Sequence, residues 1–161
     1  MKGWKKDLPH YFPNDEIVFL DELLYLHTQQ NKMNKIVQKG IELLNDGKET
    51  IILSHSFGGI LGKTMIDQAK NHQVKKFITM ATPHEMNIFG VRKAKQFLKT
   101  PKTVSVETQS FGGFLDLIVP YFWSKPQNSI QHDNFWCEHI SFLLIPATRR
   151  KVLKNCQVRT P

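Results

Sequence analysis

The stretch Thr50–Lys63 is where the sequence most clearly points to chemistry, because Ser56 stands there between an apolar run and a helix-like segment. The run Ile51–Leu53 has the composition of a buried strand, and the small residues Ser54 and Gly58 flank the serine. A tight turn between a strand and a helix presents a serine hydroxyl at the edge of a sheet, where it can attack a substrate. Such a turn is crowded, so small neighbours are required. The sequence therefore predicts that Ser56 is a nucleophile.

The tetrapeptide Ser-Phe-Gly-Gly occurs twice, at 56–59 and at 110–113. Only the first copy is followed by apolar residues at helical spacing, whereas the second leads to Asp116 and Pro120. A nucleophile turn needs a strand before it and a helix after it, which favours the first copy. Its Gly59 also allows the helix to pass close to the strand.

A serine hydroxyl attacks efficiently only when a base removes its proton and a further group holds that base in place. We predict Asp116 as this further group. It is expected just beyond a strand, at the carboxyl edge of the sheet where catalytic groups of open α/β sheets gather. Glu107 and Asp133 are the alternative acids. A capping role in a turn is the alternative for Asp116 itself.

The predicted base is His139, which lies between the strand-like residues 135–137 and the last expected helix. His132, in a polar stretch, is the alternative base, and a helix-capping role is the alternative for His139. His55 and His84 are predicted to support the site as substrate-binding residues. The side chain of His55 is expected beneath the turn and that of His84 along the pocket.

These residues resemble the α/β-hydrolase superfamily, and within it the lipase- and esterase-like members. The matching segments are Leu53–Gly59, Phe77–His84 and Asp116–Pro120, together with His139 followed by Ile140–Leu144. They occur in the family's order of serine, acid and histidine, and they cover about residues 16–155.

The resemblance implies a serine hydrolase that acts on carboxylic esters through an acyl-enzyme intermediate and uses no metal or organic cofactor. Ser56 would attack the carbonyl, His139 would act as base and then as acid, and Asp116 would orient His139. The backbone N–H of Phe57 would donate to the oxyanion. The family's second donor comes from a loop marked by His-Gly, a pair that this sequence lacks.

Residues Gly3–Leu8 resemble the segment that follows this loop in the family. We therefore expect the strand before the loop to be missing, as in an N-terminally truncated form of a longer hydrolase. The alternative is a reduced sheet in which a strand at 17–20 pairs directly with the strand at 50–53.

Strands alternating with helices predict one α/β domain over residues 1–161, with three α/β/α layers and a mostly parallel sheet reduced at its N-terminus. Strands are expected at 16–20, 50–53, 74–80 and 104–108, and helices at 31–45, 58–71, 87–98 and 141–154, the last of them interrupted near Pro146. Residues 1–15 are polar and basic, with Pro9 and Pro13 as expected breakers and Trp4, Leu8, Tyr11 and Phe12 as expected anchors. Residues 117–136 are expected to form a loop. This loop and the segment 86–89 are predicted to line an acyl pocket through Met86, Tyr121 and Trp123, with ordinary core packing as the alternative.

The net charge of +8 comes from basic residues spread along the chain, which favours solvated helix faces. A lipid or small-molecule ester is the expected partner, and weak association with an anionic membrane surface is compatible with the charge. No zinc-finger, helix-turn-helix or RNA-recognition motif is present, so nucleic acid is not expected.

The sequence has no apolar run of the roughly 20 residues that span a bilayer, no signal peptide and no metal-like spacing of its two cysteines. These features favour a cytoplasmic protein with reduced thiols. A non-catalytic or truncated hydrolase-like domain with a binding role is the alternative function, and a basic membrane-surface or nucleic-acid binder is a third.

Overall fold

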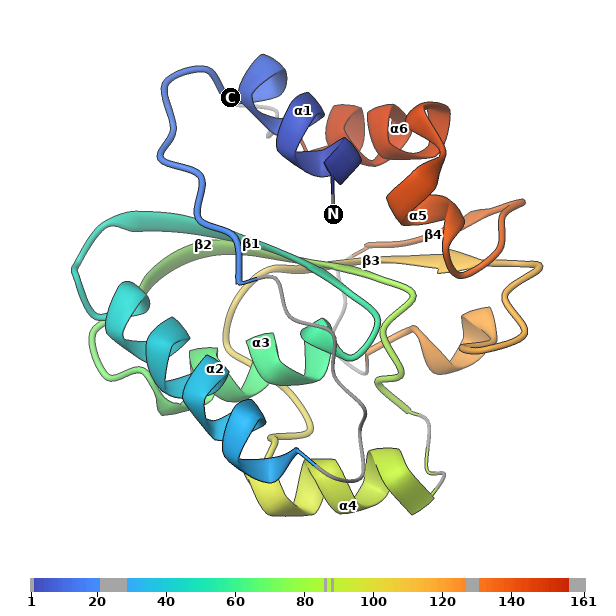
Figure 1. Ribbon diagram of the computed structural model, residues 1–161. Helices are drawn as coiled ribbons and strands as arrows, with labels where there is room; N and C mark the ends of the chain where they lie inside the picture. The colour runs from blue at the N-terminus through green and yellow to red at the C-terminus, as the bar shows by residue number, and fades with distance from the viewer. Residues whose placement is uncertain (1, 21–28, 86, 88, 127–130, 157–161) are drawn as a thin grey trace.

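The computed structural model describes residues 2–20, 29–85, 87, 89–126 and 131–156. Within these ranges a four-stranded sheet lies between two layers of helices (Figure 1). Its strands are all parallel and lie in the order β1 (Glu49–His55), β2 (Gln73–Met80), β3 (Thr108–Gly113), β4 (Gln131–Phe135). The helices are α1 (Lys2–Tyr11), α2 (Gln30–Leu44), α3 (Gly58–Gln68), α4 (Phe89–Leu98), α5 (Ser141–Leu144) and α6 (Pro146–Cys156), with a 3-10 turn η1 (Tyr121–Trp123). The prediction of a three-layer α/β fold with a parallel sheet is confirmed.

Strand β2 shows how the sheet divides the core. Phe77 packs with apolar residues of α2, α3 and α4 on one face, whereas Ile78 and Met80 pack with residues of α1, α5 and α6 on the other. Successive side chains of a strand point to opposite faces, so one apolar run supplies both cores. Figure 1 shows the same division, with α2, α3 and α4 below the sheet and α1, α5 and α6 above it.

Helix α1 is not among the elements expected from the sequence, in which Pro9 and Pro13 are breakers. Pro9 lies in the last turn of α1, so it removes one backbone hydrogen bond there and leaves the first turns intact. Contacts far along the chain hold the helix. Trp4 is buried and its indole N–H donates to the Phe142 carbonyl at 2.9 Å, and Asp7 accepts from the Arg149 guanidinium at 2.7 Å.

The expected strand at residues 16–20 is wrong. Phe19 and Leu20 pack against opposite core clusters, as alternating strand residues would, but this backbone has no sheet partner among the residues that the structure describes. In the described ranges β1 pairs only with β2. Direct pairing of residues 17–20 with the strand at 50–53 is therefore not observed.

The expected strand at 104–108 is displaced toward the C-terminus. Val104 and Val106 are buried in the core, but pairing with β2 starts where the Glu107 carbonyl accepts from the Phe77 N–H at 2.8 Å. The second Ser-Phe-Gly-Gly therefore lies within β3 itself. Strand β4 falls inside the expected loop 117–136, because its polar sequence carries no apolar strand pattern and only its pairing with β3 defines it. None of the helices in the described ranges has the length and apolar character needed to cross a bilayer.

Candidate active site

Ser56 occupies the turn between β1 and α3, and its backbone is left-handed with a φ of 53°. A residue with a side chain rarely adopts this conformation, so the turn is strained. The Ser56 N–H donates to the Met80 carbonyl at 2.8 Å, which ties the turn to the end of β2. Helix α3 leaves close to the neighbouring strand end, because a Cβ built on Gly59 would lie 2.2 Å from the hydroxyl of Thr82. The chain therefore forms the strand, tight turn and helix that the sequence predicts around Ser56.

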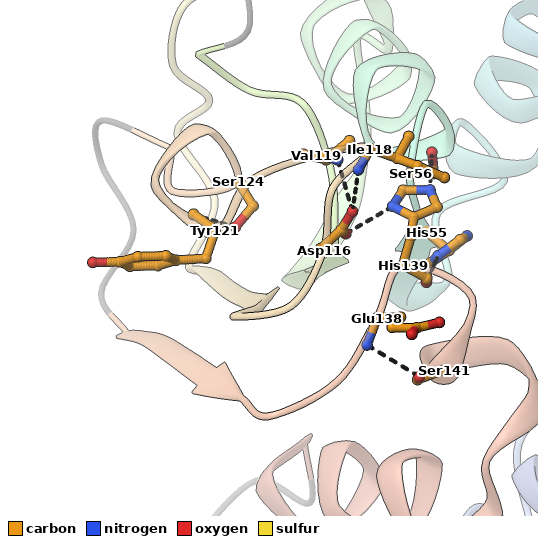
Figure 2. Close-up of polar contacts among 10 residues, drawn as sticks. All are labelled: His55, Ser56, Asp116, Ile118, Val119, Tyr121, Ser124, Glu138, His139 and Ser141. Carbon is orange, nitrogen blue, oxygen red and sulfur yellow. Dashed lines mark hydrogen bonds and ion pairs between the residues drawn. The ribbon is translucent and has the colours of Figure 1, made fainter.

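The structure brings Ser56, His139 and Asp116 together, although 83 residues separate the first two. His139 Nε2 lies 2.9 Å from Ser56 Oγ, and His139 Nδ1 lies 2.8 Å from Asp116 Oδ2. Figure 2 shows the imidazole between the hydroxyl and the carboxylate. A carboxylate accepts hydrogen bonds, so Nδ1–H donates to Asp116 and Nε2 is left to accept the serine proton. This arrangement can activate a hydroxyl nucleophile.

Asp116 is buried in the turn that follows β3, and the backbone fixes its other oxygen. Asp116 Oδ1 accepts from the N–H groups of Ile118 at 2.9 Å and Val119 at 2.7 Å. The turn-capping role considered for Asp116 is therefore present as well, and it serves to orient the oxygen that meets His139. This capping role can be predicted from the sequence Asp-Leu-Ile-Val, because an aspartate side chain commonly accepts a hydrogen bond from the backbone N–H two residues later.

The loop that carries His139 is held by a hydrogen bond to the helix that follows it. Ser141, at the start of α5, accepts at its hydroxyl from the Glu138 N–H at 3.2 Å (Figure 2). His139 itself is buried between this contact and the sheet edge.

His55 contacts the backbone of the proposed base. His55 Nε2 lies 3.0 Å from the His139 carbonyl oxygen, and the two rings are 4.8 Å apart. A carbonyl only accepts, so Nε2 carries the proton and donates. Burial, followed by the proximity of His139, lowers the pKa of His55 to about 4. His55 is therefore a neutral donor under the loop of His139, a contact that its position in the sequence does not reveal.

The contacts described for His84 involve other residues than this relay. His84 is buried with its Nε2 3.1 Å from the Thr79 hydroxyl. It lines a cavity of about 270 Å³ that also meets Lys63 and Lys95, and neither Ser56 nor His139 lines this cavity. Burial lowers the pKa of Lys63 to about 8.

The other residues predicted for the site lie in several parts of the structure. Tyr121 and Trp123 lie in η1, where Trp123 packs against Val119 and the ring of Tyr121 points away from His139 (Figure 2). Met86 lies outside the described residues. The alternative acid Glu107 is paired with Lys76 at 3.2 Å before β3, at the opposite end of that strand from Asp116.

The side chains of the alternatives His132 and Asp133 lie outside the described part. Phe57 is the first residue after the nucleophile and directly precedes α3. The first N–H groups of a helix have no acceptor within it, so they point toward a negative charge placed there. In the described ranges no group of three or more His, Cys, Asp or Glu side chains could hold a metal ion.

Comparison with known proteins identifies the family of the chain. No curated protein matches the chain. Among solved structures it is similar to MGS-MChE2, an α/β hydrolase from the metagenome of lagoon sediments at Mar Chica, Morocco, with a TM-score of 0.56 and 14% identity over 83% of this chain and 74% of that one. It is also similar to the monoacylglycerol lipase of Paleococcus ferrophilus, with a TM-score of 0.53 and 12% identity over 80% of this chain and 75% of that one.

These identities establish the fold alone. A family model described as a PGAP1-like alpha/beta domain matches residues 13–153, which is most of the chain. The chain therefore belongs to the PGAP1-like alpha/beta domain family.

Proposed function

We propose that this protein is a serine hydrolase that cleaves carboxylic esters, with Ser56 as nucleophile, His139 as base and Asp116 as the group that orients the base. The observation that carries the proposal is the continuous relay from Ser56 Oγ through His139 to Asp116, with distances of 2.9 and 2.8 Å. Its two contacts fix both nitrogens of the imidazole, which leaves Nε2 as the proton acceptor.

The reaction proceeds in two balanced halves. Ser56 Oγ attacks the ester carbonyl while its proton passes to His139 Nε2, and the carbonyl oxygen becomes an oxyanion that the Phe57 N–H stabilises. The C–O bond to the alcohol then breaks, and His139 returns the proton to the departing alcohol. Water attacks the acyl-enzyme by the same route, and the carboxylic acid leaves as Ser56 recovers its proton.

A lipid ester is the substrate class that we favour. One of the similar structures is a monoacylglycerol lipase, and large apolar side chains surround the acid and the base in this chain. Trp123 remains the candidate for binding the acyl chain, because it packs against Val119 in the connection that follows Asp116, whereas the ring of Tyr121 points away from His139.

The nucleophile is tested with a fluorophosphonate probe, which reacts with activated serines. We expect the wild-type chain to be labelled at Ser56 and the Ser56→Ala variant to remain unlabelled. A folded wild-type chain that resists labelling and hydrolyses no p-nitrophenyl ester would instead indicate a non-catalytic binding domain.

The role of Asp116 is tested against a neighbouring carboxylate. Asp116→Asn should lower kcat for a p-nitrophenyl ester by about 10³- to 10⁴-fold, because an amide at this position no longer holds the imidazole in the active tautomer. The matched control is Glu138→Gln, which neutralises the exposed carboxylate next to His139 and should change kcat less than about threefold. Equal effects of the two changes would remove Asp116 from the mechanism. An acyl thioester assayed in parallel shows whether the leaving group is restricted to an alcohol.

A further inference from the structure

Large apolar side chains are exposed around Asp116 and His139, the proposed acid and base. Leu117 is 95% exposed and Trp136 is 79% exposed. We name the following set the apolar rim, whose members are all at least half exposed: Phe114, Leu115, Leu117, Ile118, Phe122, Trp136, Ile140 and Leu144.

The apolar rim belongs to the segments that carry the acid and the base. Leu117 follows Asp116 directly, and Ile140 follows His139 directly. Trp136 comes directly after β4. Because the carboxyl ends of parallel strands meet at one edge of a sheet, the rim gathers at the edge where Ser56 lies. Figure 1 shows the turn after β3 and helix α5 on this same side of the sheet.

Ring contacts join two members of the rim, Phe114 and Trp136, to each other and to the neighbouring Tyr121. The rings of Phe114 and Trp136 are 4.7 Å apart, and those of Phe114 and Tyr121 are 5.6 Å apart. The Phe114 N–H donates to the Phe135 carbonyl at 2.7 Å, which holds the two segments together. Several large apolar side chains exposed on neighbouring segments commonly mark a site that another apolar surface covers.

The exposed charges in the same part of the sequence as the rim favour an anionic lipid surface as the covering partner. In residues 114–154, among the side chains that the structure describes, the exposed charged residues are Lys125, Glu138, Arg150, Lys151 and Lys154. Four of these are positive and one is negative, and the chain as a whole carries +8. Basic residues next to a membrane-facing apolar surface are attracted to anionic headgroups. A second copy of the chain would place the same cations against one another, which disfavours self-association.

We propose that the apolar rim inserts into the surface of a lipid bilayer that contains anionic lipid, and that this contact presents ester bonds of the bilayer to Ser56. Apolar side chains with flanking Lys and Arg bind in the plane of such an interface without spanning it. This inference rests on the proposed function for the presentation of the ester, but the contact with the bilayer is testable without catalysis.

The test uses the full chain with Ser56→Ala, so that the vesicles are not hydrolysed. Sedimentation is measured with vesicles of phosphatidylcholine and with vesicles of phosphatidylcholine mixed with phosphatidylserine. We expect the parent to bind the mixed vesicles more tightly, and we expect Leu117→Ser with Trp136→Ser to weaken that binding at least about tenfold, since each lost side chain removes a large apolar area. The matched control is Phe97→Ser, which removes a partly exposed phenylalanine from α4 on the opposite helix layer and should bind as the parent does.

A second double variant tests the charges and leaves the rim unchanged. Arg150→Gln with Lys154→Gln should reduce binding to the mixed vesicles and leave binding to pure phosphatidylcholine unchanged. Circular dichroism and thermal unfolding establish that each variant is folded.

Three results would overturn the proposal: no binding of the parent to mixed vesicles, equal binding by the rim variant, or a dimer in solution that the rim variant dissociates. Labelling with the fluorophosphonate probe is read separately. A chain that binds vesicles but resists the probe contradicts the proposed function alone, and a labelled chain that ignores vesicles contradicts this inference alone.

Discussion

At the scale of single residues, the site combines side chains that the sequence predicts with contacts that it does not. Ser56, Asp116 and His139 were predicted from the turn they occupy and from the resemblance, and the structure brings them within hydrogen-bonding distance. The contact of His55 with the His139 carbonyl joins residues 84 positions apart. No local pattern encodes such a contact, because it exists only once the sheet edge has assembled.

His55 should make stability depend on pH. Its pKa of about 4 in the folded chain lies below the ordinary value of 6.5, so the unfolded chain binds more protons between these values. The free energy of unfolding is therefore fully retained above pH 6.5 and should fall by about 3 kcal/mol as the pH drops toward 4. His55→Gln keeps an N–H donor but does not titrate, so its curve should be flatter over this range.

Urea unfolding of wild type and His55→Gln at several pH values between 7.5 and 4.5 measures the difference. His10→Gln, which removes an exposed histidine from α1, reports any general effect of losing a histidine. Parallel curves for wild type and His55→Gln would show that His55 is not buried as a neutral donor.

At the scale of elements, the sequence predicts those helices and strands that have a local apolar pattern and misses those that depend on contacts with distant residues. Strands β1 and β2 and helix α3 were predicted because their apolar patterns are local. Strand β4 and helix α1 were missed, since β4 is a polar segment defined by pairing with β3, and α1 is held by Trp4 and Asp7 through partners more than 130 residues away. Residues 16–20 show the opposite case, in which the apolar pattern of a strand occurs without a partner strand.

The two glycines after Ser56 should respond very differently to an added methyl group. A Cβ on Gly58 would meet nothing closer than 3.9 Å, whereas one on Gly59 would overlap the side chain of Thr82 at the end of β2. Gly59→Ala should therefore lower the free energy of unfolding by about 1–3 kcal/mol and displace the turn that carries Ser56.

Gly58→Ala is the matched control, and its stability should stay within about 1 kcal/mol of wild type because alanine favours the helix. Chemical denaturation gives both values, and the rate of labelling by the fluorophosphonate probe reports the position of Ser56. A Gly59→Ala variant that matches Gly58→Ala in both measurements would show that α3 does not depend on this close approach.

At the scale of the whole molecule, α1 donates a hydrogen bond to a backbone carbonyl that has no helical donor at the break between α5 and α6. In an uninterrupted helix the Phe142 carbonyl would accept from the N–H of residue 146, but that residue is Pro146 and has no N–H. The indole of Trp4 takes its place at 2.9 Å, and the Arg149 guanidinium satisfies the next carbonyl, that of Leu143, at 2.8 Å. The N-terminal helix thus supplies a donor that the C-terminal helices lack, beside the loop that carries His139.

Trp4→Phe removes this donor and keeps a large ring in the core. A buried carbonyl left without a donor costs about 1–3 kcal/mol, so the free energy of unfolding should fall by that amount. Trp136→Phe is the matched control, because its indole is exposed, and it should change stability by less than about 0.5 kcal/mol. Urea unfolding of both variants at pH 7.5, above the range in which His55 titrates, isolates the effect. If Trp4→Phe were as stable as Trp136→Phe, the Phe142 carbonyl would have another donor, and α1 would contribute to the molecule only through apolar packing.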